Sequence, residues 1–81
     1  MIVNDPEYMF ELRMEYLIAD LKEKINQSGI PKRQLVERLG TSESQLYRLF
    51  DPNKATKNFQ QLFRLASMVG LEIEFKLKKA A

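Results

Sequence analysis

Residues Gln34–Phe50 read QLVERLGTSESQLYRLF and contain two short helical patterns, one on each side of a single glycine. Apolar residues at helical spacing predict a helix over 32–39, after which the glycine interrupts the chain. Ser42 followed three residues later by Gln45 is a capping-box pattern, which opens a second helix over 43–50. The stretch therefore predicts two short helices joined by a tight turn.

This arrangement is a helix-turn-helix unit, in which a turn of three or four residues containing glycine joins two helices. Gly40 allows the chain to turn sharply. Apolar side chains on the inner faces lock the helices at a steep angle and leave the outer face of the second helix free for the major groove of DNA. These side chains are Leu35, Leu39, Leu46 and Leu49.

A long amphipathic helix precedes the unit. Asp5 and Pro6 are a capping carboxylate and a proline at the first helical position, and Gly29 ends the pattern, so we expect a helix over 6–28. Near its start the helix also carries the apolar side chains Met9, Leu12 and Tyr16. They give it a broad apolar surface that a further part of the chain or a partner would have to cover. The apolar stripe expected to face the core is Phe10, Met14, Leu17, Ile18, Leu21 and Ile25.

The chain beyond residue 50 predicts a loop, a helix and a strand. A polar loop runs from Asp51 through Asn58, and a helix follows over 59–69 and stops at Gly70. The period then changes to two, and the residues expected to face the interior of a half-buried strand over 71–77 are Leu71, Ile73, Phe75 and Leu77. The expected fold class is mainly α: one domain over 1–81, a four-helix bundle with a C-terminal β-strand.

A single strand needs a partner, because its backbone amides and carbonyls are otherwise unpaired. The first candidate is the same strand of a second copy, so we expect a homodimer joined through the apolar residues of 71–77. Ile2-Val3 of the same chain is a competing partner, and the sheet of a different protein is a third. A two-fold dimer would also place two recognition helices on half-sites about 34 Å apart in a palindromic operator.

Charge is unevenly distributed along the 81 residues, whose net charge is +2. Residues 1–30 carry three basic and six acidic side chains, residues 31–58 carry six basic and three acidic ones, and residues 59–81 carry four basic and two acidic ones. The middle of the chain would therefore attract an anionic partner such as DNA.

Composition also indicates what the protein does not do. The chain has no cysteine and therefore no thiolate ligand, and it has no histidine, which is the commonest metal ligand and the commonest acid–base group. We therefore expect no metal, no cofactor and no enzymatic activity. No apolar run approaches the roughly 18 residues that cross a membrane, and the N-terminus lacks the features of a signal peptide. A cytoplasmic protein is the expectation.

The pattern Gln-Leu-Val-Glu-Arg-Leu-Gly-Thr-Ser, continued by Leu-Tyr-Arg-Leu, resembles the helix 2–turn–helix 3 core of the XRE, or lambda-repressor-like, helix-turn-helix proteins. The resemblance extends without gaps from about Ile30 to Phe59 and more loosely from Asp5 to Leu77. It implies a repressor-type regulator that reads double-stranded DNA with the helix starting at Ser42. Lys32 stands where the family often has a phosphate-binding glutamine, and a lysine can replace that contact electrostatically.

The resemblance also implies which residues meet the DNA. The positions that reach base edges in such proteins are Glu43, Ser44, Gln45, Tyr47 and Arg48 here. Arg48 is the leading candidate, because a guanidinium can bind O6 and N7 of guanine together. The residues that flank the recognition helix are candidate phosphate contacts: Lys32, Arg33, Lys54, Thr56, Lys57 and Asn58.

Two alternatives remain open. The first alternative is an antitoxin, because the order of segments along the chain resembles that of HigA-type antitoxins. The chain has an acidic leading helix that starts Asp-Pro-Glu-Tyr, then the helix-turn-helix core, then Val-Gly-Leu-Glu-Ile-Glu-Phe near the end. That resemblance implies a partner, a small ribonuclease toxin, and repression of the protein's own operon. The other alternative is a protein-interaction module that does not bind DNA, which the basic middle segment disfavours.

Overall fold

This computed structural model describes residues 5–79. The longest element is the helix α1 (Pro6–Ser28), close to the start of that range. The Asp5 carboxylate caps it by accepting a hydrogen bond from the backbone N–H of Glu7 at 3.0 Å. The helix ends at Gly29, whose φ of 72° is left-handed. α1 therefore covers the range over which the sequence predicts the first helix.

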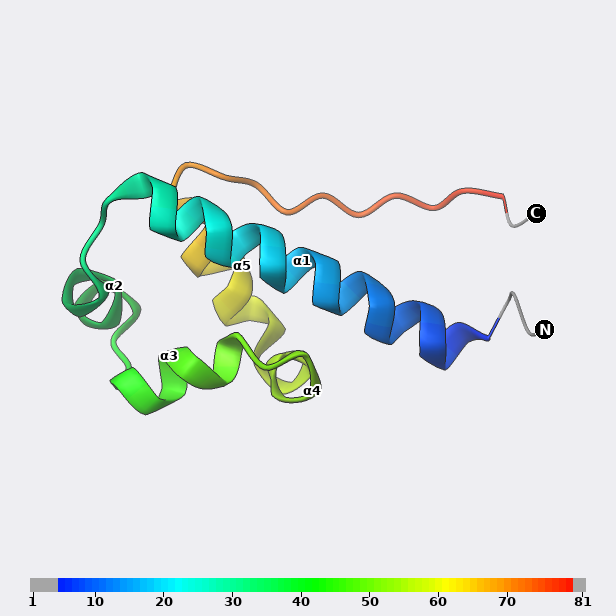
Figure 1. Ribbon diagram of the computed structural model, residues 1–81, viewed down its shortest axis with the longest axis horizontal. Helices are drawn as coiled ribbons and strands as arrows, with labels where there is room; N and C mark the ends of the chain where they lie inside the picture. The colour runs from blue at the N-terminus through cyan, green and yellow to red at the C-terminus, as the bar shows by residue number, and fades with distance from the viewer. Residues whose placement is uncertain (1–4, 80–81) are drawn as a thin grey trace.

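The N-terminal turns of α1 project beyond the rest of the bundle, whereas its later turns pack against it (Figure 1). Four residues of its stripe are buried, namely Met14, Ile18, Leu21 and Ile25. Phe10 was expected in the core but is 47% exposed, because it meets only the short turn at residues 52–56 and lines an open hollow with it. Within the described part of the chain, no helix combines the length and the apolar character needed to cross a membrane.

The helix-turn-helix unit consists of α2 (Lys32–Leu39) and α3 (Glu43–Leu49). Gly40 has a φ of 66°, and its N–H donates to the carbonyl oxygen of Glu37 at 3.1 Å. The Ser42 hydroxyl accepts from the backbone N–H of Gln45 at 3.2 Å and so begins α3. The helix expected over 43–50 ends one residue earlier, with Phe50 as its cap.

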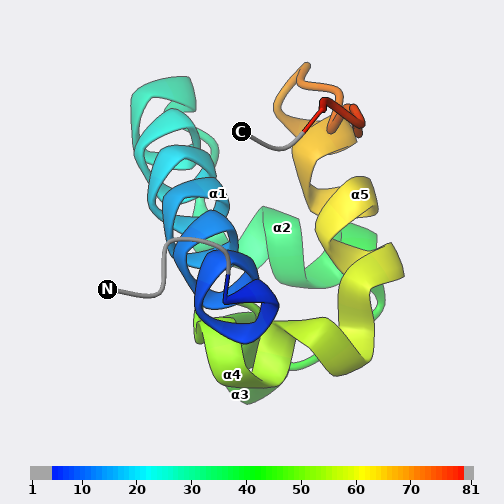
Figure 2. The same cartoon turned by 90° about the vertical axis from the view of Figure 1, so that its right-hand side faces the viewer.

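Four leucines with at most 1% exposure form the centre of the core. Leu35 comes from α2 and Leu46 from α3, while Leu62 and Leu65 come from α5 (Phe59–Met68). Figure 2 shows α1 and α5 on opposite sides with α2 between them and α3 and α4 below. Each helix therefore buries one face against a common centre.

The expectation of a polar loop over Asp51–Asn58 is wrong. Residues 52–58 form the single-turn helix α4 (Pro52–Ala55) and the 3₁₀ helix η1 (Thr56–Asn58). The Asp51 carboxylate accepts from the backbone N–H of Asn53 at 3.0 Å, and Pro52 occupies the first helical position. Ala55 is completely buried, so the turn is held by the core as well as by its cap.

The expected C-terminal strand is not found between residues 5 and 79. The chain leaves α5 through Val69 and Gly70, and residues 71–79 are extended without a strand partner among the described residues. The segment runs antiparallel to α1 (Figure 1). The Leu71 N–H donates to the carbonyl oxygen of Ala66 at 2.9 Å, and beyond it the helices of the described range offer no strand edge with which the backbone could pair. The competing partner Ile2-Val3 lies outside the described residues.

The alternating side chains of this segment are also less buried than expected. Leu71 and Ile73 are half-buried and pack against the core. Phe75 is 69% exposed, although its ring lies 5.6 Å from that of Phe59 and 5.5 Å from that of Phe63. Leu77 is fully exposed. The expectation that all four face the interior is therefore wrong for the last two.

Replacing Gly40 by alanine is expected to lower the free energy of unfolding by about 1–2 kcal/mol, the cost of a left-handed backbone for a residue with a Cβ. No atom lies within 4 Å of the position of that Cβ, so no packing clash adds to the cost. Gly40→Asn should cost less, because asparagine tolerates this conformation better. Urea denaturation measures both variants, and equal losses would contradict this explanation.

Candidate nucleic-acid interface

The outer face of α3 carries the five candidate base-contact residues. All of them are exposed to solvent: Glu43, Ser44, Gln45, Tyr47 and Arg48. On the inner face Leu46 is 1% and Leu49 4% exposed, so the helix is fixed by its apolar side. α3 runs along one edge of the molecule (Figure 1). This edge presents one short helix that is held by its apolar side and exposes these five side chains to solvent.

Lys32 and Tyr47 join the first turn of α2 to the outer face of α3. The Lys32 ammonium donates a hydrogen bond to the Tyr47 hydroxyl and lies 4.3 Å from the centre of its ring. The same hydroxyl donates to the Glu43 carboxylate at 3.4 Å. A candidate phosphate contact and two candidate base contacts therefore form one chain of polar interactions.

The contact with Tyr47 raises the pKa of Lys32 above its ordinary value. The hydrogen bond to the Tyr47 hydroxyl is the main cause, partial desolvation acts in the opposite direction, and the charge of Glu43 adds to the increase. Lys32 therefore stays cationic at neutral pH. Because folding raises this pKa, the contact stabilises the fold at neutral pH, and that stabilisation is lost only as the pH rises through the raised value.

The other candidate phosphate contacts lie on the elements that adjoin α3. Arg33 is exposed on the first turn of α2, and Lys54 is exposed on α4 and lies 3.9 Å from the Asp51 carboxylate. The remaining three, Thr56, Lys57 and Asn58, form η1 and are exposed. α4 packs against α3 in the bundle. The helical turn that replaces the expected loop thus holds these residues in a fixed place relative to α3.

Arg64 is a cation near this surface that the sequence analysis did not select. It lines a hollow of about 260 Å³ together with Lys57 and Asn58 at the start of α5. Gln61 lines the same hollow, and its buried Oε1 has no hydrogen-bond partner. The signal available in the sequence was the position of Arg64 on the second turn of the helix that follows η1. The arrangement adds a positive charge beside the candidate phosphate contacts.

The described residues hold no group of three or more acidic side chains placed to bind a metal ion. The polar groups on the α3 edge are exposed to solvent.

Comparison with known proteins gives no match: neither a protein-family model, nor a curated protein, nor a solved structure matches this chain.

Substituting Tyr47 by phenylalanine is expected to lower the pKa of Lys32 toward its ordinary value, because the hydroxyl that accepts its hydrogen bond is removed. An NMR titration of the lysine side-chain resonances measures this pKa. Tyr16→Phe is the matched control, since Tyr16 is exposed on α1 and belongs to no contact with Lys32. An unchanged pKa in Tyr47→Phe, or an equal decrease in the control, would refute the role of this contact.

Proposed function

We propose that this protein binds double-stranded DNA in a sequence-specific manner and regulates transcription as a repressor, with α3 in the major groove. The observation that carries the proposal is the arrangement of α3, whose inner face is buried and whose exposed outer face presents Glu43, Ser44, Gln45 and Arg48 together with the aromatic Tyr47. A major groove about 12 Å wide accommodates one helix. The sequence resemblance to XRE-type proteins favours this function, and a repressor of this kind would act in the cytoplasm.

Contacts to the DNA backbone would come from both sides of α3. Lys32 and Arg33 lie on the turn where α2 begins, and Lys54 and Lys57 lie on the elements that follow α3. Cations on two sides of a recognition helix fix its depth and direction in the groove without reading sequence. Thr56 and Asn58 supply hydroxyl and amide groups to the same backbone. Neither a metal nor a cofactor is part of this function.

Arg48 is proposed to read a guanine. Arg48→Ala should weaken binding to the preferred duplex by about 1–3 kcal/mol and relax the preference at one position per half-site. Lys57→Ala is the matched comparison: it should weaken binding to all sequences alike and reduce the slope of log affinity against log salt by about 1.

Selection from random duplexes, followed by titrations at several salt concentrations, measures both effects. A loss common to all sequences in Arg48→Ala would make this residue a phosphate contact. Affinity that does not depend on salt, or no preference among duplexes, would refute sequence-specific binding.

A homodimer joined through residues 71–77 is the second part of the proposal. The segment is already extended, and the two side chains at its far end, Phe75 and Leu77, are exposed. Antiparallel pairing with a second copy would satisfy the backbone and cover these apolar side chains. The two-fold axis would present two copies of α3 to a palindromic operator, with half-sites about 34 Å apart.

Glu74→Pro is expected to convert a dimer at micromolar concentration into a monomer with much weaker operator affinity, because proline removes a backbone donor. Glu74 is exposed, so the core packing is left unchanged. Glu74→Ala keeps the donor and should remain dimeric. Sedimentation measures the three proteins. A wild-type monomer that still binds a palindrome tightly would exclude dimerisation through this segment.

A second candidate function is that of an antitoxin, and the projecting half of α1 favours it. Three large aromatic side chains are exposed there, Tyr8 at 55%, Phe10 at 47% and Tyr16 at 61%. Residues 5–20 also carry five carboxylates against one arginine. Exposed aromatic side chains among acidic ones suit a basic partner protein, such as a small ribonuclease toxin.

The triple variant Tyr8→Ser, Phe10→Ser and Tyr16→Ser should bind the small basic protein encoded by an adjacent gene more than about tenfold more weakly, because exposed aromatic anchors dominate such interfaces. Calorimetry with the purified pair measures this, and an unchanged DNA affinity shows that the variant is folded. If wild type and variant bind the partner equally, the partner does not dock on this half of α1.

A further inference from the structure

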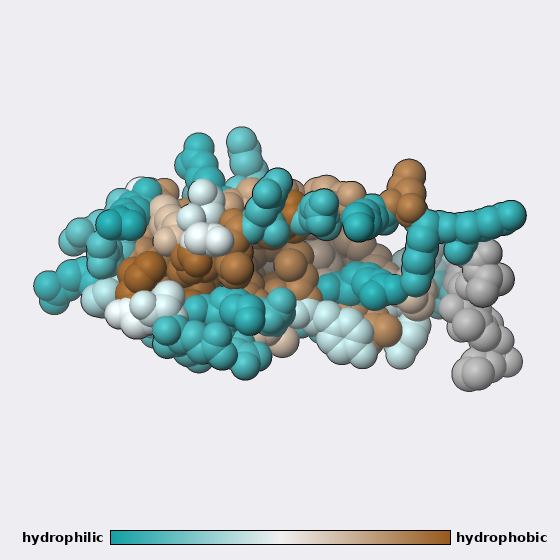
Figure 3. All heavy atoms as spheres, turned by 90° about the horizontal axis from the view of Figure 1, so that it is seen from above, coloured by the Kyte–Doolittle hydropathy of each residue, from teal (hydrophilic) through white to brown (hydrophobic). Residues whose placement is uncertain are grey.

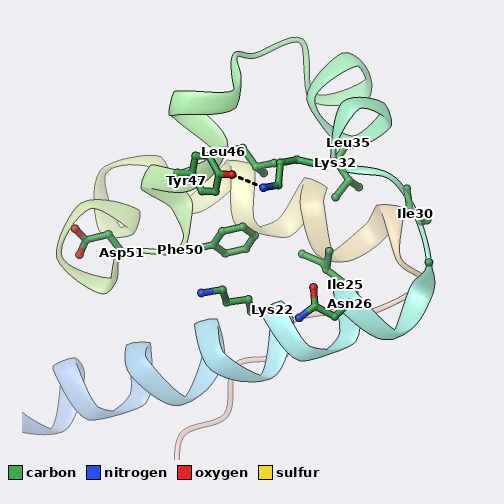
Figure 4. Close-up of a pocket in the computed structure, with 11 residues that line it drawn as sticks. Lys22, Ile25, Asn26, Ile30, Lys32, Leu35, Leu46, Tyr47, Phe50 and Asp51 are labelled. Atoms are coloured by element: carbon green, nitrogen blue, oxygen red, sulfur yellow. Dashed lines mark hydrogen bonds between the residues drawn. The ribbon is translucent and has the colours of Figure 1, made fainter.

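A cavity of about 590 Å³ lies between the C-terminal half of α1, the start of α2 and the inner edge of α3. Figure 4 shows side chains from the three helices directed toward a common space. Its volume is within the range of about 300–1,000 Å³ over which proteins bind small organic molecules. The proposed function uses only its rim, at Lys32 and Tyr47.

The inner wall of the cavity is apolar. Ile25, Leu35 and Leu46 are buried core residues that line it, and Ile30 is half-buried beside them. The half-buried ring of Phe50 is directed into the space between α1 and α3 (Figure 4). A separate apolar area, framed by hydrophilic side chains, is visible from above on the face formed by α1 and the C-terminal segment (Figure 3). In the cavity, an apolar ring or chain would replace water on the apolar wall favourably.

The charged groups of the lining are mainly cationic. Lys22 approaches from α1, with its ammonium 5.8 Å from the centre of the Phe50 ring, and Lys32 approaches from α2. Figure 4 shows these lysines on opposite sides of the Phe50 ring. The lining contains one carboxylate, that of Asp51, which accepts from the backbone of α4 at 3.0 Å and lies 3.9 Å from Lys54. Two cations thus face the cavity, while its carboxylate is already engaged.

We propose that this cavity binds a small aromatic carboxylate. The aromatic body would lie on the apolar wall and against the rings of Phe50 and Tyr47, which favour offset or edge contacts with another ring. The carboxylate would accept a charge-assisted hydrogen bond from Lys32, and the charge of Lys22 on the other side of the Phe50 ring would add to the attraction. A neutral ligand of the same shape would make no charge-assisted hydrogen bond with the ammonium groups and would lose that part of the affinity.

The ligand would also affect DNA binding, a consequence that rests on the proposed function. Lys32 contacts Tyr47 in the free protein and is a proposed phosphate contact. A carboxylate that engages Lys32 competes with a DNA phosphate for the same ammonium. Because coupling between two sites is reciprocal, the ligand weakens DNA binding by the factor by which DNA weakens ligand binding.

Direct titration of the full-length protein with naphthoate, without DNA, tests the site. The expected result is saturable one-to-one binding with a Kd of about 1 mM or tighter, and naphthamide should bind at least about tenfold more weakly. Lys22→Gln should weaken naphthoate binding about tenfold. Lys24→Gln is the control, because Lys24 is exposed on the same helix but does not line this cavity. Backbone amide shifts in NMR spectra should map to the residues that line the cavity.

Equal affinity for the acid and the amide, equal losses in the two lysine variants, or shifts confined to other parts of the chain would overturn the proposal. A second experiment measures operator binding with and without naphthoate, and saturating naphthoate should weaken it by about fivefold or more. Unchanged operator affinity would overturn the coupling and leave the site intact. A protein that binds naphthoate but no DNA would refute the proposed function alone.

Discussion

Burial of four leucines, Leu35, Leu46, Leu62 and Leu65, is the constraint on which the rest of the structure depends. α2 has eight residues and α3 seven, and helices shorter than about 12–15 residues are marginal in water by themselves. These helices exist because their leucines are buried against α5 and α1. The same packing turns the polar face of α3 outward, so the core determines the orientation of the candidate DNA-binding surface.

The contact between Lys32 and Tyr47 is a polar link between the same helices that the leucine core joins. It links α2 to α3 on the outside of the molecule, while Leu35 and Leu46 link them on the inside. Its ammonium lies at the border between the proposed DNA surface and the cavity beside α1. Under the proposed function, this one ammonium would meet either a DNA phosphate or the carboxylate of a ligand, and ligand binding would then regulate DNA binding.

Local signals in the sequence predicted much of the helical part of the fold. The Asp5 and Ser42 caps and the left-handed Gly29 and Gly40 lie where the pattern places helix ends. α4 was missed because Asp51-Pro52-Asn53 is typical of a turn as well as of a helix start, and only the burial of Ala55 in the folded chain distinguishes them. The strand was predicted from alternation, which describes side chains and does not supply a partner for the backbone.

In the candidate site too, features set by local sequence were predictable and features set by the packing of distant residues were not. Exposure of the polar residues on α3 was predictable, because a seven-residue helix that buries its leucines must expose its other face. The contact between Lys32 and Tyr47 spans 15 residues and depends on the angle between two helices, which sequence spacing does not give. Arg64 and Lys57 line one hollow, and the position of Lys57 in it follows from η1, which the sequence did not predict.

Mapping of backbone amide shifts by NMR during titration with a selected DNA duplex would show whether α3 enters the major groove. If α3 enters the major groove, the largest shifts should fall on α3, on the first turn of α2 and on residues 53–58, with small changes in the projecting half of α1. Shifts concentrated in that half of α1 or in residues 71–79, with α3 unchanged, would contradict the account.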